Sequence, residues 1–225
     1  MAEGMLTLDQ LKKEITAGTI DTVVAAMVDL QGRLVGKRFH AKYFADGGYE
    51  ETHGCNYLLG VDIEMEPVPG YKATSWEKGY GDYVLKPDLS TATIDPFTAQ
   101  PTLILFCDTI EPATGQLYNR CPRGIAKKAL AYMSSAGVGD TAFFGPEAEF
   151  FVFDDVRYSA NPYNTGFKLD SSELPTNSDT EYEGGNLGHR VQIKGGYFPV
   201  PPQDSAQDMR GEMLAAMQSM GVKVE

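Results

Sequence analysis

Two glutamates near the middle of the chain have a spacing that suits the binding of divalent cations. They are Glu147 and Glu149, in the stretch GPEAEFFVF. In an extended strand alternate side chains share a face, so the two carboxylates would lie on one face, roughly 7 Å apart at about 3.3 Å per residue. That separation is too long for a shared proton but suits ligands of two separate cations. The alternative is a solvent-facing polar edge of an amphipathic strand, and the residues alone leave both interpretations open.

A second candidate is the segment GGYFPVPP at residues 195–202. Its prolines restrict the backbone and its glycines permit a close approach to another group, so the segment could hold Tyr197 in a fixed orientation. A plain structural connection is the favoured interpretation when only the composition is considered. The histidines and cysteines lack metal-ligand spacing, and P-loop, GxGxxG, GxSxG and CxxC motifs are absent from the sequence. The common nucleotide and nucleophile motifs therefore give no indication of the substrate.

The composition narrows the class of protein. With 19 basic and 31 acidic residues the formal charge is −12, which argues against nucleic acid and anionic membranes as partners. The hydrophobic fraction of 42% is that of a folded protein, and 225 residues suffice for one large or two small domains. The first residues do not resemble a secretory signal, and the apolar runs are too short to span a bilayer. We expect a cytoplasmic protein whose three cysteines are reduced thiols.

Periodicity and turn residues predict the elements that must position the candidate residues. Before the glutamates we expect a helix at 7–18, a hairpin at 21–28 and 33–39, a short helix at 41–44, mostly loops and short strands at 47–80, strands at 83–86 and 102–107, and a helix at 122–137. We then expect a strand at 142–153 that carries the glutamates, a loop at 154–189, a helix at 205–221 whose methionines pack in a core, and a strand beginning at 222. Because the chain stops at the start of that strand, we expect it to be the amino-terminal portion of a longer protein.

From about Ile94 onward the sequence resembles type I glutamine synthetase. The resemblance rests on four motifs in the family's order: FGPEAEFFVFDD at 144–155, NTGFKLD at 164–170, GNLGHR at 185–190 and KGGYFPVPPQDSAQDMR at 194–210. It implies an ATP-dependent ligation of ammonia to glutamate through γ-glutamyl phosphate, with two Mg²⁺ or Mn²⁺ ions. By resemblance, Glu147 and Glu149 are ligands of one metal ion each, Tyr197 lies at the ammonium pocket, and Glu225 lies at the ATP site.

The same resemblance implies an architecture. We expect an α+β protein with a small β-grasp amino-terminal domain at residues 1–100, a hinge near 95–102, and the start of a catalytic domain at 101–225 built on a curved antiparallel sheet with helices. Active sites of the family form between subunits, so a homo-oligomer with dodecamer-like rings is expected. The family's HHHE stretch and its later arginines would follow residue 225, so we expect only the opening part of the site.

The first ninety residues resemble a different branch, the glutamine-synthetase-like γ-glutamylamide ligases. This resemblance is carried by the stretch that begins ETHGCNYLLG at Glu51. Where type I enzymes have a DGSS loop, this chain reads VPGYKATSW from Val68 to Trp76. Two alternatives follow: a γ-glutamylamide synthetase that uses a small amine such as methylamine, or a non-catalytic chain that assembles with complete synthetases.

Overall fold

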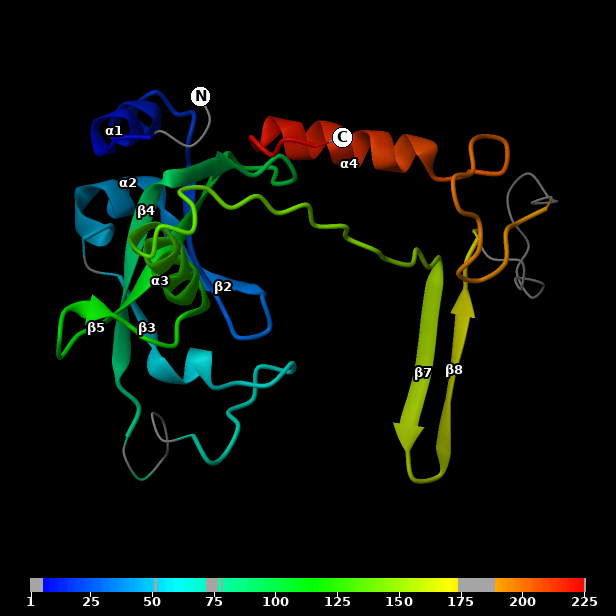
Figure 1. The fold of residues 1–225 in the computed structure, drawn as a ribbon, viewed down its shortest axis with the longest axis horizontal. Coiled ribbons are helices and arrows are strands. Elements are labelled where there is room, and N and C mark those ends of the chain that lie inside the picture. The colour runs from blue at the N-terminus through cyan, green and yellow to red at the C-terminus, as the bar shows by residue number, and fades with distance from the viewer. Residues whose placement is uncertain (1–5, 51, 72–76, 78, 174–188, 225) are drawn as a thin grey trace. The chain divides into compact units, whose positions relative to one another are not determined.

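The computed structural model describes residues 6–50, 52–71, 77, 79–173 and 189–224. The chain divides into two compact units, Met1–Phe143 with Met217–Lys223, and Phe144–Ala216 with Val224–Glu225. Each unit is described by itself, and Figure 1 labels many of their helices and strands. The domain boundary expected at residue 100 stays a prediction.

The first unit is built on a six-stranded mixed sheet with the order β2-β1-β5-β4-β3, to which β6 is added beside β5. Its central strands β1 and β5 are parallel, whereas the other paired strands are antiparallel. A hairpin whose first strand lies beside a parallel later strand is the β-grasp arrangement, so the predicted α+β fold with a β-grasp domain is confirmed. The strands are β1 (Thr22–Val28), β2 (Leu34–His40), β3 (His53–Cys55), β4 (Asp82–Ile94), β5 (Thr102–Glu111) and β6 (Gln116–Leu117).

The predicted first hairpin is confirmed, and its sequence explains its close packing. The apolar run TVVAAMV forms β1, and Gly32, with a φ of 83°, lies in the turn that leads to β2. In β2, Gly36 pairs with Ala26, and a Cβ atom at this glycine would lie 2.1 Å from the carbonyl oxygen of Ala25. Only glycine therefore fits at this point of the hairpin.

One hydrophobic core lies between the sheet and the first helices. Helix α1 (Leu8–Thr16) begins with the predicted capping box, in which Thr7 and Gln10 exchange hydrogen bonds, and it buries Leu11 completely. Phe44 is also fully buried, and the core cluster contains Leu103 and Leu105 of β5 as well. The remaining short helical elements of this unit are α2 (Ala41–Tyr43), the π-helical turn η1 (Phe44–Gly48) and the 3₁₀ turn η2 (Asn56–Leu59).

Helix α3 (Pro122–Ser135) is attached to the sheet by a cluster of charged side chains. Arg123 donates to Asp108 of β5 at 2.9 Å and to Asp88 of β4, and Lys127 donates to Asp108 at 2.5 Å. These carboxylates and Arg123 are less than one-quarter exposed, so solvent screens the cluster less than an ordinary surface ion pair. The helix predicted from the proline at its first position is confirmed.

The part of the chain after residue 153 differs from the sequence prediction in several places. The predicted loop over 154–189 is wrong in its first half, where β7 (Asp155–Asn161) and β8 (Asn164–Asp170) form an antiparallel hairpin. Helix α4 (Gln207–Ser219) forms as predicted, but none of its residues is buried, so the expected core packing of its methionines is wrong. Residues 222–224 form no strand. Within the described part of the chain, helices are too short or too polar to cross a membrane.

Candidate functional site

The two glutamates lie in an extended segment that is exposed to solvent. Residues 140–153 belong to no helix or strand, so the predicted strand over 142–153 is wrong. A β-strand needs a hydrogen-bonded neighbour, and in the described residues no strand pairs with this segment. Glu147, Glu149 and the aromatic residues around them are all exposed; Phe144, for example, is 89% exposed.

Near the carboxyl end of this segment, two aromatic side chains two residues apart contact each other. The rings of Phe151 and Phe153 stack with centroids 6.1 Å apart and an angle of 14° between their planes. Residues two apart can stack in this way when successive side chains point to opposite sides. The same alternation would place Glu147 and Glu149 on a common side of the segment, which is the arrangement that the two-cation hypothesis requires.

The carboxyl end of this segment is tied to the base of the β7–β8 hairpin. The hydroxyl of Ser171 donates to the carbonyl oxygen of Val152 at 2.7 Å, and the amide of Asp154 donates to the carbonyl oxygen of Asp170 at 2.8 Å. Ser171 and Asp170 are both buried, and Arg157 donates to the Asp170 carboxylate at 2.8 Å. The hairpin therefore holds the chain directly after the acidic segment.

The hairpin is absent from the sequence-based prediction, although the sequence contains a signal for it. Asn161, Pro162, Tyr163 and Asn164 form the turn, and the side-chain oxygen of Asn161 accepts hydrogen bonds from the amides of Tyr163 and Asn164 at 3.0 Å each. An Asn-Pro pair that starts a turn between two runs of alternating residues is a hairpin signal. The polar composition of the flanking strands concealed it.

The chemistry of the acidic segment fits divalent cations, but only in part. Carboxylate oxygens are the ligands preferred by Mg²⁺ and Mn²⁺. The structure forms no group of three or more His, Cys, Asp or Glu side chains able to hold a metal ion, as far as the described residues extend. The two glutamates thus provide the ligand type without the further donors that a complete site needs.

The remaining candidate residues lie apart from a formed pocket or outside the described residues. Tyr197 is 94% exposed, and its ring contacts only that of Phe198 among the ring pairs of the described chain, at 4.8 Å between centroids. The preceding turn is closed by the amide of Gly195, which donates to the carbonyl oxygen of Gln192 at 2.7 Å. Glu225 lies outside the described residues. The structure therefore does not bring Glu147, Glu149 and Tyr197 into one site.

Comparison with known proteins identifies the sequence around these residues. Residues 119–225 match the family model of the glutamine synthetase catalytic domain. The chain is 67% identical over 169 residues to glutamine synthetase of Bradyrhizobium diazoefficiens, which covers 75% of this chain and 35% of the relative. It is 58% identical over 188 residues to glutamine synthetase of Methylococcus capsulatus, which covers 81% of this chain and 40% of the relative.

A solved structure has the same fold. The electron cryomicroscopy structure of Plasmodium falciparum glutamine synthetase superposes with a TM-score of 0.71 at 22% identity, over 98% of this chain and 41% of that one. The chain spans between one-third and two-fifths of the length of the curated relatives named above. Residues 119–225 thus carry the match to the glutamine synthetase catalytic domain, and the chain is similar to proteins named glutamine synthetase over about three-quarters of its length.

Proposed function

We propose that the full-length gene product carrying this sequence ligates ammonia to glutamate at the expense of ATP. The observation that carries the proposal is the match of residues 119–225 to the catalytic-domain model, which includes the acidic segment with Glu147 and Glu149. Support also comes from the 67% identity to a protein named glutamine synthetase.

The proposed reaction has two steps, a phosphoryl transfer and the replacement of phosphate by ammonia. The γ-carboxylate oxygen of glutamate forms a bond to the terminal phosphorus of ATP, and the bond from that phosphorus to the bridging oxygen breaks, which yields γ-glutamyl phosphate and ADP. The nitrogen of ammonia then forms a bond to the γ-carbonyl carbon, inorganic phosphate leaves, and a proton is released. Catalysis of this kind depends on holding the reactants in line and on balancing the phosphoryl charge.

In this proposal Glu147 and Glu149 hold one Mg²⁺ or Mn²⁺ ion each. Divalent cations neutralise phosphoryl oxygens and orient the carboxylate that attacks. The exposure of both carboxylates leaves their oxygens accessible to ions and to further ligands. Tyr197 would lie at the ammonium pocket and Glu225 at the ATP site. The protein would form homo-oligomeric, dodecamer-like rings in which a neighbouring subunit completes each active site. The free thiols of the three cysteines favour a cytoplasmic location.

The test is metal-dependent activity of the full-length gene product, measured as Mn²⁺-dependent γ-glutamyl transfer. Replacing Glu147 or Glu149 by Gln should lower the rate at least about a hundredfold, because a carboxylate ligand becomes a neutral amide. The matched control is Glu212→Gln on the exposed side of α4, which should leave the rate within about twofold. An unchanged rate in both Glu147→Gln and Glu149→Gln would contradict the metal assignment.

The amine substrate needs a separate test, because the sequence from Val68 to Trp76 departs from the type I loop. Most of this stretch, residues 72–76, lies outside the described residues. We therefore propose a γ-glutamylamide synthetase as the second candidate. A kcat/KM with methylamine above that with ammonia would favour the second candidate, and the reverse ratio would favour glutamine synthesis.

A further inference from the structure

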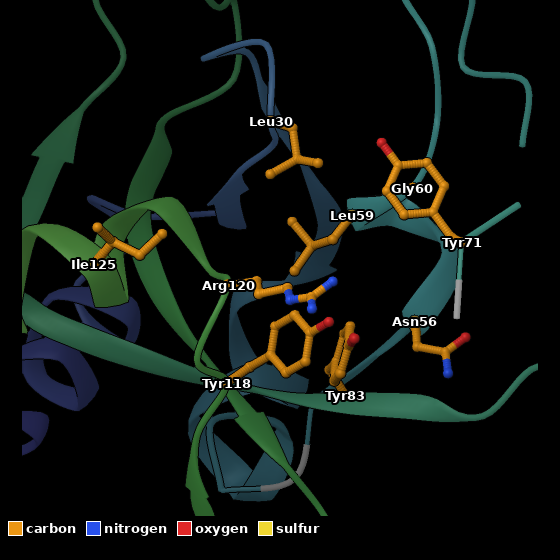
Figure 2. Close-up of a pocket in the computed structure, with 9 residues that line it drawn as sticks. All are labelled: Leu30, Asn56, Leu59, Gly60, Tyr71, Tyr83, Tyr118, Arg120 and Ile125. Atoms are coloured by element: carbon orange, nitrogen blue, oxygen red, sulfur yellow. The ribbon is translucent and has the colours of Figure 1, made fainter. Parts of the chain in front are cut away.

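A cavity in the first unit has the chemistry of a small-molecule site. Its volume is about 230 Å³, and Figure 2 shows residues from several elements around it. Ligand pockets for drug-sized molecules measure about 300–1,000 Å³, so this cavity suits a smaller molecule. Among the described residues that line it, Glu147, Glu149 and Tyr197 are absent.

Most of the cavity wall is apolar or aromatic. Leu30 comes from the turn between β1 and β2, Leu59 from η2, and Ile125 from the first turns of α3. Leu59 is 7% exposed, whereas Leu30 and Ile125 are about half exposed, so the cavity is floored by the core and opens to solvent. Such a wall favours a ligand with an apolar body.

Two tyrosines stiffen one side. The rings of Tyr83 and Tyr118 lie 4.6 Å apart between centroids, and their hydroxyl groups are hydrogen-bonded to one another. Burial raises the pKa of Tyr83 well above its usual value, and the bond to Tyr118 adds to this, so Tyr83 stays neutral. This side therefore offers fixed aromatic surface rather than negative charge that would repel an anion.

One cation lies at the cavity without an anionic partner in the described chain. Arg120 is exposed and lines the cavity, and neither a hydrogen bond nor an ion pair of its guanidinium is formed with a described residue. It directly precedes Cys121, the N-cap of α3, and the positive end of a helix dipole also favours an anion. In a chain with a net charge of −12, an unpaired arginine beside an apolar cavity is suited to a carboxylate.

The second polar feature is an acceptor without a donor. Asn56, at the start of η2, lines the cavity, and its side-chain oxygen is buried with no hydrogen-bond partner in the described structure. A buried acceptor left unpaired destabilises a fold by about 1–3 kcal/mol, so most such atoms are satisfied by a group that the protein or its ligand supplies. That oxygen has almost no accessible surface, so a hydroxyl or amino group of a ligand would supply the missing donor only after the Asn56 side chain turns toward the cavity.

We propose that this cavity binds a small organic carboxylate that has an apolar body and a hydrogen-bond donor. The carboxylate pairs with Arg120, and the apolar body contacts Leu30 and Leu59. The donor bonds to the Asn56 oxygen once that side chain has turned toward the cavity. Inorganic phosphate fits less well, because it would leave the apolar wall uncovered. This binding site does not depend on the proposed ligase activity.

The test is calorimetric titration of the 225-residue chain with 4-hydroxyphenylacetate, combined with NMR of the leucine and isoleucine methyl groups. We expect saturable binding and shifts of the Leu30, Leu59 and Ile125 methyl signals. Removing the carboxylate, in 2-(4-hydroxyphenyl)ethanol, should weaken binding at least about tenfold, since charge-assisted hydrogen bonds contribute about 1.5–3 kcal/mol. Capping the donor, in 4-methoxyphenylacetate, should weaken it about fivefold or more.

Protein variants complete the test. Arg120→Met should weaken binding at least about tenfold, while the control Arg38→Met on the exposed face of β2 should stay within about twofold. Leu30→Trp should abolish binding by filling the cavity, and circular dichroism melting checks that each variant folds. The proposal is overturned if no probe binds, if only phosphate binds, if the alcohol binds as well as the acid, or if Arg120→Met binds like the wild type.

Discussion

Apolar side chains on extended segments are buried in the first unit and exposed in the second. In the first unit Leu103 and Leu105 are 0% exposed, because β5 is paired on both sides and one face of the sheet is covered by helices. In the second unit Phe144 is 89% exposed and Phe151 54%, and Ala206 is the one buried apolar residue among those described. Alternation in the sequence is enough to extend the chain, but burial requires a second layer.

The difference in burial distinguishes the first unit, which contains the hydrophobic core, from the second unit, which contains the candidate metal ligands. The first unit has a core that can determine its fold. A charged cluster attaches α3 to the sheet, and an ion pair lies within the turn of the first hairpin. In the second unit the acidic residues are accessible, and the described contacts that position them are the hydrogen bonds at the base of the β7–β8 hairpin. We therefore expect substitutions in the first unit to affect stability and substitutions in the acidic segment to affect metal binding.

The largest predicted effect on stability tests this comparison directly. Leu103→Ala should lower the free energy of unfolding by about 2–5 kcal/mol, because it leaves a cavity in a closed core. Phe151→Ala removes more atoms but should change the value by less than about 0.5 kcal/mol, since the side chain is already half exposed. Urea denaturation of the 225-residue chain measures both. Equal losses would show that the two environments do not differ as described.

A smaller effect is expected at the charged cluster beneath α3. Arg123→Ala leaves Asp88 and Asp108 facing each other with only Lys127 between them, and it should lower the free energy of unfolding by about 1–3 kcal/mol. Lys128→Ala, on the exposed side of the same helix, is the control and should cost less than about 0.5 kcal/mol. If the two variants melt at the same temperature, the cluster does not hold the helix.

The turn of the first hairpin should make stability depend on pH. Burial raises the pKa of Asp29, but hydrogen bonds from the amides of Arg33 and Gln31 and from the Arg33 guanidinium outweigh it, so the folded-state pKa is lowered. The carboxylate therefore stabilises the fold fully above its unfolded pKa of about 3.9, and this contribution is lost as the pH falls through the folded value.

The measurement compares wild type with Asp29→Asn in urea at several pH values. The difference in unfolding free energy should be constant near neutral pH and should shrink below about pH 4, because the variant has no group to protonate. The neighbouring contacts of Arg33 with the carbonyl oxygens of Asp62 and Ile63 stay available in both proteins. A difference that is the same at all pH values would contradict the assignment.

Local sequence signals predicted the elements whose stabilising contacts lie close in the chain. The capping box at Thr7, the apolar run of β1 and the proline at the start of α3 each predicted the element that the structure contains. The order of the sheet depends on the parallel pairing of β1 with β5, which spans about eighty residues and was expected only through the family resemblance. Periodicity carries no information on such a pairing.

The sequence was less informative where tertiary partners decide the outcome. The run from Ala142 to Phe153 has the pattern of a strand, yet in the described structure no neighbour pairs with it. The cavity beside Arg120 could not be predicted, because Leu30, Asn56 and Tyr118 are brought together only by the folded sheet. Glu147 and Glu149 were identified from their type and spacing, whereas their roles were supplied by the resemblance and remain predictions.

The most direct test of the central claim, that the acidic segment holds the cations of a ligase, is a Mn²⁺ titration followed by electron paramagnetic resonance on the full-length gene product. The wild type should bind two Mn²⁺ ions per subunit in a saturable manner, and Glu147→Gln and Glu149→Gln should each lose or strongly weaken one of them, while Glu212→Gln keeps both. Two unchanged ions in both site variants would contradict the claim.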